Sequence, residues 1–200
     1  MRKIVVFTMI SLDGVMQAPG GPEEDTSGGF RFGGWTVPYR HESFGSIIKA
    51  ELSVPFDLLL GRKTYEIFAS YWPKQTGPIA DPFNQATKYV VSGQGVDLTW
   101  KESILIKEDV VAKIKALKKE DGPVFQVWGS GKLLQTLLKN DLVDELRLRI
   151  FPITLGLGKR LFAEGTIPAA FELIDSKALP SGVILANYKR AGEFKTGSLA

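Results

Sequence analysis

The chain has 200 residues, which suits a single domain, and its 44% hydrophobic and 24% charged residues are typical of a protein that buries its own core. The absence of cysteine excludes disulfides, thiolate nucleophiles and cysteine-ligated zinc, and it suits a reducing cytoplasm. A net charge of +3, spread among mixed acids and bases, favours a small anionic ligand over nucleic acid.

Strand and helix patterns alternate along most of the chain. In chain order, they predict a strand over residues 3–10, a helix over 41–52, a strand over 56–61, a helix over 62–72, a strand over 88–92, a helix over 109–122, a strand over 123–129, a helix over 130–140, and strands over 143–153, 171–180 and 182–191. Repeated β-α units indicate a mostly parallel sheet between two layers of helices, and the last two strands add an antiparallel edge. We therefore expect one three-layer α/β domain over residues 1–191 and a flexible tail over residues 192–200.

Two stretches near the N-terminus need separate interpretation. The apolar run over residues 3–10 resembles part of a signal peptide, but Asp13 follows closely and no small-residue cleavage site comes after it, so we interpret the run as a strand. Residues 17–40 hold six glycines and three prolines, and an unstructured loop of this length is uncommon unless it has a function. The aromatic residues in this loop, including Trp35, either form a lid over a bound ligand or pack the loop against the domain. No segment reaches the ~20 apolar residues of a membrane-spanning helix, so we expect no membrane partner.

A glycine and two cations follow the predicted strand over residues 56–61. Gly61 ends the strand, Arg62 and Lys63 begin a helix, and Thr64 adds a hydroxyl in the same turn. The N-terminus of a helix carries the positive end of the macrodipole and favours acidic side chains. Two cations at this point indicate either an anionic ligand held among them or side chains that simply point to solvent.

A second glycine turn has the same pattern. Gly129, Ser130 and Gly131 follow a predicted strand, and a helix with Lys132 in its first turn comes next. The spacing matches neither the G-x-G-x-x-G motif of dinucleotide-binding folds nor the Walker motif. Since ligands of open α/β sheets bind beyond the carboxyl ends of the strands, a ligand with several phosphates could contact both turns, with Ser92 at a third strand end.

These segments, in this order, resemble the dihydrofolate-reductase-like fold. "GRKTYE" (61–66) resembles the helix start that holds the NADPH phosphates in that family, "YVVS" (89–92) resembles the strand end beside the adenine ribose, and "WGSGKLL" (128–134) is similar to the glycine pair beneath the pyrophosphate. "SLDG" (11–14) and "DELRLRIFPITLGLGKRLF" (144–162) more specifically resemble the reductase domain of the bifunctional riboflavin-biosynthesis deaminase–reductase and its stand-alone relatives. The resemblance covers nearly the whole chain, and the H-x-E and P-C-x-x-C motifs of the zinc deaminase half do not occur.

This resemblance implies an NADPH-dependent reductase that works as a homodimer. Arg62 would face the 2′-phosphate and Thr64 the pyrophosphate. The cofactor-binding residues that the resemblance implies are Gly61, Arg62, Lys63, Thr64, Ser92, Gly129, Ser130 and Gly131. The cofactor would supply the hydride, so the chemistry needs neither cysteine nor a metal. The dimer would use part of residues 143–191, because the edge of the two C-terminal strands needs covering.

One departure from the family pattern bears on the substrate. Dihydrofolate reductases carry an acid in the first helix, about sixteen residues before the Gly-Arg pair, and that position is Gly45 here. We therefore expect a small heterocycle, or a carbonyl or imine compound, rather than a folate. The residues expected to line its pocket are Phe44, Ile48 and Trp35. Water, Asp13 or Glu42 is expected to supply the proton.

Two other functions fit the same residues. The chain could be a non-catalytic nucleotide-binding module that kept the fold and lost its acid. It could also be an anion- or RNA-binding protein that uses the two basic turns. Hydride transfer to a trial substrate separates the reductase from the inactive module, and the salt dependence of RNA binding tests the third reading.

Overall fold

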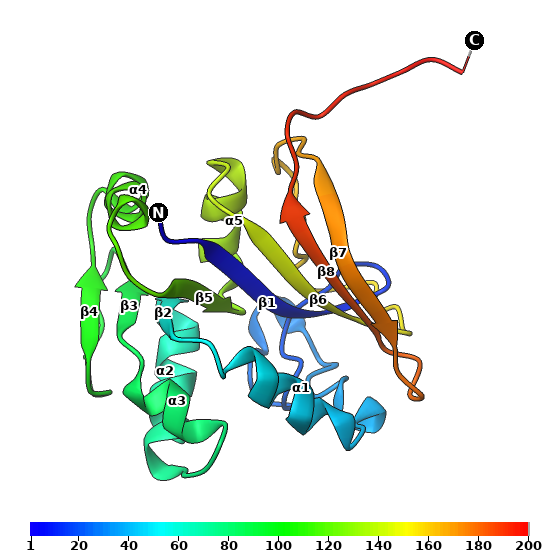
Figure 1. Ribbon diagram of the computed structural model, residues 1–200. Helices are drawn as coiled ribbons and strands as arrows, with labels where there is room; N and C mark the ends of the chain where they lie inside the picture. The colour runs from blue at the N-terminus through cyan, green and yellow to red at the C-terminus, as the bar shows by residue number, and fades with distance from the viewer. Residues whose placement is uncertain (200) are drawn as a thin grey trace.

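The central strand, β1 (Ile4–Ser11), lies between β5 (Val124–Trp128) and β6 (Glu145–Phe151) and pairs with both in parallel. In this computed structural model, which describes residues 1–199, the eight strands form one sheet in the order β4-β3-β2-β5-β1-β6-β8-β7 (Figure 1). Seven of the eight residues of β1 are buried, because a central parallel strand is covered on both faces. This burial explains why the β1 sequence is a continuous apolar run rather than an alternating one.

The rest of the sheet follows the predicted mixed pattern. β2 (Phe56–Gly61), β3 (Lys88–Val91) and β4 (Ser103–Ile106) extend the parallel part beyond β5. On the other side, β8 (Ile184–Arg190) runs antiparallel to β6, and β7 (Phe171–Ala178) forms the antiparallel edge. The prediction of a mostly parallel sheet with antiparallel C-terminal strands is confirmed.

Helices cover both faces of the sheet, as the three-layer prediction requires (Figure 1). One face carries α4 (Val110–Lys119) and α5 (Gly131–Lys139). The opposite face carries α1 (Ser43–Glu51), α2 (Arg62–Tyr71) and α3 (Ala80–Gln85). The short connections from β2 to α2 and from β5 to α5 place both helix N-termini at the carboxyl ends of the strands, where ligands of open α/β sheets bind.

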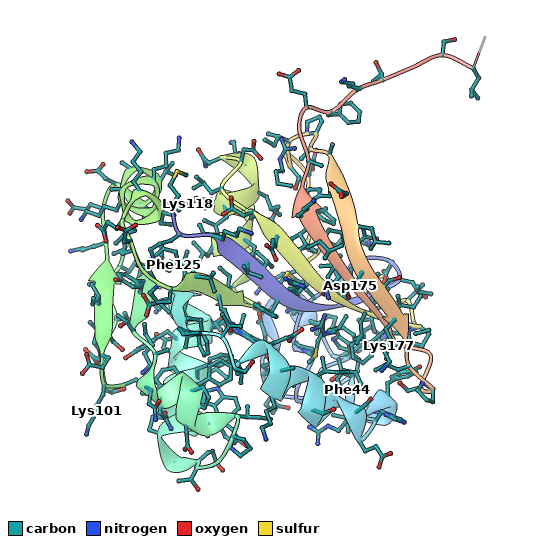
Figure 2. All side chains as sticks on the ribbon, viewed as in Figure 1. Phe44, Lys101, Lys118, Phe125, Asp175 and Lys177 are labelled. Carbon is teal, nitrogen blue, oxygen red and sulfur yellow. The ribbon has the colours of Figure 1, made fainter. Side chains whose placement is uncertain are left out.

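Each face of the sheet has its own hydrophobic core. On one face, Leu134 and Leu137 of α5 pack in a cluster with Val6 of β1. On the other face, Tyr65 of α2 packs in a cluster with Leu58 of β2. Figure 2 shows side chains filling the space between the sheet and both helix layers. These two cores hold the helices, and therefore the two glycine turns, at fixed positions on the sheet.

Two elements of the structure, α3 and β4, were not predicted from the sequence. α3 has six residues and contains Pro82, and β4 has four residues preceded by Glu102 at a positive φ of 55°. Segments this short do not repeat a helical or strand period, so their sequences give little signal. The predicted helix over residues 109–122 ends at Lys119, and Asp109 occupies its N-cap position without a side-chain cap hydrogen bond.

Residues 17–40 are more ordered than the predicted loop. They contain two short 3-10 helices, η1 (Ser27–Gly29) and η2 (Val37–Tyr39), and a third, η3 (Trp72–Lys74), follows α2. Phe30 and Trp35 are only 4% and 7% exposed. These two rings therefore pack the loop against the domain, which is the second of the two roles expected for them.

The C-terminal segment continues past the sheet. Residues 192–199 form no helix or strand and extend away from the domain (Figure 1). Within residues 1–199, no helix combines the length and the apolar character that crossing a membrane would require.

Candidate functional site

The turns that follow the neighbouring strands β2 and β5 meet at the carboxyl ends of these strands. The backbone N–H of Gly61 donates to Ser130 Oγ at 2.9 Å. A Cβ atom on Gly61 would lie 3.4 Å from the Ser130 Cβ, and a Cβ atom on Gly129 would lie 3.8 Å from Thr64 Oγ1. The two strand–glycine–helix units are therefore direct neighbours, as we expected from the rule that ligands of open α/β sheets bind at the carboxyl ends of the strands.

The turn before α5 has an unusual backbone conformation. Gly129 and Ser130 both have positive φ angles, 67° and 70°, and only glycine adopts this region without strain. A strained non-glycine residue persists where surrounding contacts fix it, and such residues concentrate at functional sites. The hydrogen bond that Ser130 accepts from Gly61 is one such contact, and it ties the strained turn to the neighbouring one.

The two cations at the start of α2 take different partners. Arg62 lies 3.5 Å from Glu66, one turn along the helix, and both side chains are about half exposed. Lys63 reaches away from the helix and donates to Asp25 Oδ1 at 2.6 Å. The first turn of α2 has no acid of its own. An anion therefore does lie beside these cations, and it is a carboxylate of the same chain.

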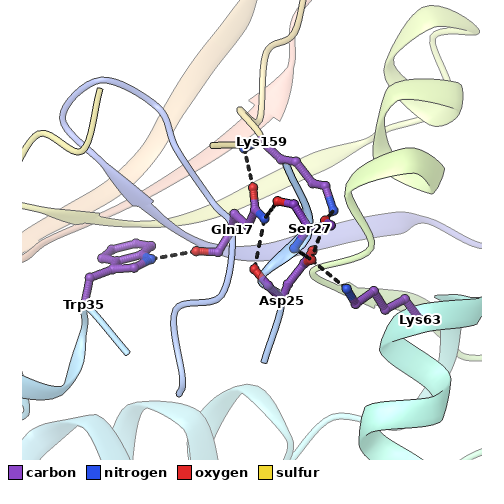
Figure 3. Close-up of polar contacts among 6 residues, drawn as sticks. All are labelled: Gln17, Asp25, Ser27, Trp35, Lys63 and Lys159. Atoms are coloured by element: carbon purple, nitrogen blue, oxygen red, sulfur yellow. Dashed lines mark hydrogen bonds and ion pairs between the residues drawn. The ribbon is translucent and has the colours of Figure 1, made fainter. Parts of the chain in front are cut away.

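Asp25 bridges two lysines that are distant in the sequence. Its Oδ2 accepts a hydrogen bond from Lys159 Nζ at 2.6 Å, while Oδ1 accepts those from Lys63 and from the Ser27 hydroxyl (Figure 3). Burial raises the pKa of the Asp25 carboxyl, but the hydrogen bonds from Lys159, Lys63 and Ser27 outweigh it and hold this pKa well below its ordinary value. The Asp25 carboxylate therefore stays charged throughout the neutral range.

Gln17 organises the segments around this bridge. Its amide nitrogen donates to the carbonyl oxygens of Asp25 and Ser27, both at 2.9 Å, and its amide oxygen accepts from the Lys159 N–H at 3.0 Å (Figure 3). The carbonyl of Gln17 also accepts the Trp35 indole N–H at 2.7 Å. Gln17 is only 4% exposed. Its buried side chain therefore joins the backbones of Asp25, Ser27 and Lys159 to one another.

Asp13, a predicted proton donor, holds a loop in place. Its carboxylate accepts the N–H groups of Leu155 and Gly156 at 3.1 and 2.9 Å and the hydroxyl of Ser11 at 2.5 Å, and Arg160 lies beside it. Although partial burial raises the pKa of Asp13, these hydrogen bonds lower it to about 2. A carboxyl with this pKa is ionised at neutral pH, so the geometry argues against Asp13 as a proton donor.

The other candidate acid, Glu42, is exposed at the residue that precedes α1. Gly45, the position where folate reductases carry their acid, is also exposed, and a Cβ atom there would meet no atom within 4 Å. The structure therefore leaves open space at Gly45. The acid nearest to it in the sequence is the exposed Glu42, which precedes α1.

The three predicted pocket residues divide between two clusters. Phe44 stacks on Phe151 with ring centroids 6.2 Å apart, and Trp35 meets the same ring edge-on at 5.3 Å. Ile48, although on the same helix as Phe44, packs with the core around Tyr65 instead. Figure 2 shows Phe44 on α1, on the face of the sheet that α1 covers. The structure thus brings Phe44 and Trp35 together through Phe151 and keeps Ile48 apart from them.

Ser92, the remaining predicted ligand contact, lies one strand away from the two turns. It follows Val91, which is paired with Gly61 in the sheet. Its buried hydroxyl donates to the carbonyl of Gly95 at 2.7 Å, so it closes the turn after β3. A contact between Ser92 and a ligand stays a prediction.

Asp25, Lys159 and Gln17 are the residues of this site that the sequence did not reveal. The available signal was the acidic run "PEED" (22–25) inside a glycine-rich loop, since an acid there could form an ion pair with Arg62 or Lys63. Lys159 follows Gly156 and Gly158, a glycine-and-base pattern that by itself indicates a loop leaving a strand, with any ligand role secondary.

The paired turns present groups that suit an anionic ligand. The groups at the junction are the first backbone N–H groups of α2 and α5, the Thr64 hydroxyl and the Lys63 ammonium, and all of them can donate hydrogen bonds. The glycines let the two turns pack closely against each other, since a Cβ atom on Gly61 would contact Ser130 and one on Gly129 would contact Thr64. The donor set therefore fits the phosphates of a dinucleotide.

Known proteins share this fold over almost their full lengths. The chain is 24% identical over 192 residues to the uncharacterized protein YyaP of Bacillus subtilis (strain 168), and the match covers 94% of each chain. A putative riboflavin biosynthesis protein from Shewanella sp. PV-4 is 23% identical with a TM-score of 0.66, over 95% of this chain and 99% of that one. Dihydrofolate reductase from Enterococcus faecalis, complexed with NADP(H) and RAB-propyl, is 16% identical with a TM-score of 0.58, over 95% and 97%.

These structural likenesses confirm the predicted dihydrofolate-reductase-like fold. The family comparison is more specific, because the model of the RibD C-terminal domain matches residues 2–185. That range includes both glycine turns, the Asp25 bridge and all six parallel strands. The chain therefore belongs to the RibD C-terminal domain family.

Proposed function

We propose that this protein is an NADPH-dependent reductase of a small heterocyclic, carbonyl or imine substrate. The observation that carries the proposal is the hydrogen-bonded junction of the two glycine turns, where the Gly61 N–H meets Ser130 Oγ at 2.9 Å. Two helix N-termini converge there, and such termini bind phosphate groups through their free N–H groups and their dipoles. The family and the fold support a reductase of this kind.

The residues at the junction would divide the phosphates between them. The N–H groups that follow Gly129, the Thr64 hydroxyl and the Lys63 ammonium would bind the pyrophosphate, while Arg62 would face the 2′-phosphate. When bound, the cofactor supplies the hydride, and the protein supplies position and charge. Ser92 would lie near the ribose.

The substrate would lie against the aromatic group formed by Phe44, Trp35 and Phe151. Gly45 offers no carboxylate to a pterin ring, and the space beside it is open. Because the pKa of Asp13 is lowered to about 2, we propose that water, or Glu42, supplies the proton. We further propose a cytoplasmic homodimer with no nucleic-acid partner.

Calorimetric titration with NADPH and with NADH tests the proposal directly. We expect NADPH to bind in the micromolar range and more tightly than NADH, and we expect its absorbance to fall when a reducible heterocycle or imine is added. NADPH binding without turnover of any trial substrate would favour the alternative, a non-catalytic nucleotide-binding module of the same fold. The observation that favours this alternative is the use of Asp13 to hold the 155–156 backbone. Failure to bind NADPH at millimolar concentration would contradict both.

A further inference from the structure

The two lysines on Asp25 bracket the junction of the glycine turns. Lys63 is the second residue of α2. The stem of Lys159 lies over the first residue of α5, because a Cβ atom on Gly131 would be 3.8 Å from Lys159 Cδ. The two ammonium groups thus approach the same carboxylate, one from α2 and one from the loop that passes the start of α5, and each donates to it at 2.6 Å.

Lys159 is held there by its backbone. Its N–H donates to Gln17 Oε1 at 3.0 Å, and its carbonyl accepts the Met16 N–H at 2.8 Å. Gly158 allows this close packing, because a side chain there would meet Val15 at 2.7 Å, and its φ of 117° favours glycine. The backbone of Lys159 is therefore fixed by residues 15–17, which follow β1, and does not depend on Asp25; its ammonium donates to Asp25 and to the Ser27 hydroxyl.

We infer that Lys63 and Lys159 form one anion site, which Asp25 fills in the absence of ligand, and that a pyrophosphate-bearing ligand enters by displacing the Asp25 carboxylate. This inference rests on the proposed function and deepens it. It adds Lys159 to the ligand-binding residues, and it makes the segment that carries Asp25 an internal competitor for the site.

The exposure of the two lysines favours displacement. The side chains of Lys63 and Lys159 are 52% and 43% exposed, so a ligand can reach both ammonium groups and solvent screens their ion pairs with Asp25. A pyrophosphate offers both ammonium groups more negative charge and more acceptor oxygens than one carboxylate does. The Asp25 carboxylate, at 13% exposure, covers the ammonium groups that such a ligand would need.

The chain that follows Asp25 contains two glycines in open space. Gly28 and Gly29 follow it with φ angles of 70° and 73°, and a Cβ atom on either would meet nothing within 4 Å. Asp25 itself is joined to the buried part of the domain through its carbonyl, which accepts the Gln17 amide at 2.9 Å. Displacement therefore requires this short segment to swing away and to break the bonds from the Gln17 amide to the Asp25 and Ser27 carbonyls, while Phe30 and Trp35 keep the rest of the loop in place.

Replacing Asp25 shows whether this residue competes with the ligand or closes over it, because the two cases change the NADPH affinity in opposite directions. Asp25→Asn removes the charge and frees both lysines, so we expect NADPH to bind three- to tenfold more tightly than to the wild type. Glu23→Gln is the matched control, because it removes the same charge from an exposed residue two positions away and should change the affinity less than twofold. If Asp25→Asn weakens binding, Asp25 closes over the ligand and the inference is wrong. Equal affinities of wild type and Asp25→Asn would also overturn it.

Amide hydrogen exchange with inorganic pyrophosphate tests displacement without the dinucleotide. In the wild type, saturating pyrophosphate should accelerate exchange across residues 20–29 by at least threefold, because it takes both lysines from Asp25. In Asp25→Asn the same segment should exchange fast from the start and respond little. Unchanged or slower exchange in the wild type would contradict the inference. Should NADPH bind to neither protein while pyrophosphate still releases the segment, the proposed function fails and the displacement stands.

Discussion

Gly61 and Ser130 are 69 residues apart in the sequence, yet the N–H of one donates to the hydroxyl oxygen of the other at 2.9 Å. This contact places the backbone of β2 against the start of α5. The N-termini of α2 and α5 therefore lie side by side, where we place the phosphates of the ligand.

Gly61→Ala should separate folding from binding. Its φ of −77° suits alanine, and the new Cβ would lie 3.4 Å from the Ser130 Cβ, which is an ordinary contact distance. We expect thermal unfolding to stay within a few degrees of the wild type, while calorimetry shows weaker NADPH binding, because the methyl group contacts Ser130 in the turn that would bind the pyrophosphate. Gly45→Ala is the control, since it adds a methyl group to an open helix position and should leave the affinity unchanged. Wild-type affinity in Gly61→Ala would place the cofactor elsewhere.

Arg62→Ala should change the choice of cofactor. A hydrogen bond to a charged group contributes roughly 1.5–3 kcal/mol, so removing the guanidinium should weaken NADPH binding by about tenfold or more. NADH lacks the 2′-phosphate, so its affinity should stay nearly constant. Lys115→Ala, which removes an exposed cation of α4, controls for net charge. Equal losses for NADPH and NADH would refute the assignment of Arg62 to the 2′-phosphate.

Dihydrofolate should not be a substrate. A charge-assisted pair between a carboxylate and the pterin ring is a strong recognition contact, and Gly45 cannot form it. We expect no dihydrofolate-dependent loss of NADPH absorbance and weak methotrexate binding. Turnover near one per second or faster, which is ordinary for enzymes, would mean that Glu42 or another acid replaces the missing carboxylate.

Asp13 should contribute to stability above its folded pKa. Its folded pKa is about 2, below the unfolded value, so its contribution is complete above about pH 4 and disappears as the pH falls toward 2. Asp13→Asn should therefore lower the free energy of unfolding by about 1 kcal/mol at pH 7, since partial exposure screens the interaction, and by little at pH 2. Urea unfolding between pH 2 and pH 7 measures this difference. Asp97→Asn, at an exposed acid, is the control, and parallel curves for wild type and Asp13→Asn would disprove the claim.

The proposed homodimer should depend on the C-terminal edge of the sheet. β7 is an edge strand on which Leu173 and Ile174 are 48% and 44% exposed, and exposed apolar edges usually need covering. Light scattering at micromolar concentration should give twice the monomer mass for the wild type, and Ile174→Lys should shift it toward the monomer. Ile104→Lys adds the same charge to the opposite edge, where Ile104 is 47% exposed, and should leave the dimer intact. A monomeric wild type would refute the proposal.

The sequence predicted the fold well where one feature repeated or a glycine ended an element. The leucines of α5 and the continuous apolar run of β1 each mark a buried element, and the predicted sheet is the one observed. α3 and β4 were not predicted because they depend on packing against Tyr65 and Trp100 rather than on a repeating pattern of their own. The Tyr65 hydroxyl, for example, accepts the backbone N–H of Trp100 at 3.0 Å.

The candidate site was predictable only in part. The meeting of Gly61 with Ser130 follows from a general rule about parallel sheets, so the two turns could be paired from the sequence. The Asp25 bridge depends on the path of an irregular loop, which no local pattern determines. Ile48 was grouped with Phe44 by helical spacing, although the two side chains enter different cores.

The position of β1 has a consequence for synthesis of the protein. Ile4 pairs with Phe125, and Val5 pairs with Glu145, so β1 gains its two neighbours only after more than a hundred further residues have been made. At roughly 5–20 residues per second, a ribosome leaves this strand without a partner for on the order of ten seconds. During that time an apolar segment with two unpaired edges is open to other nascent chains. We therefore expect the yield of folded protein in cells to depend on chaperones that bind β1 while it is unpaired, more than the stability of the finished domain would suggest.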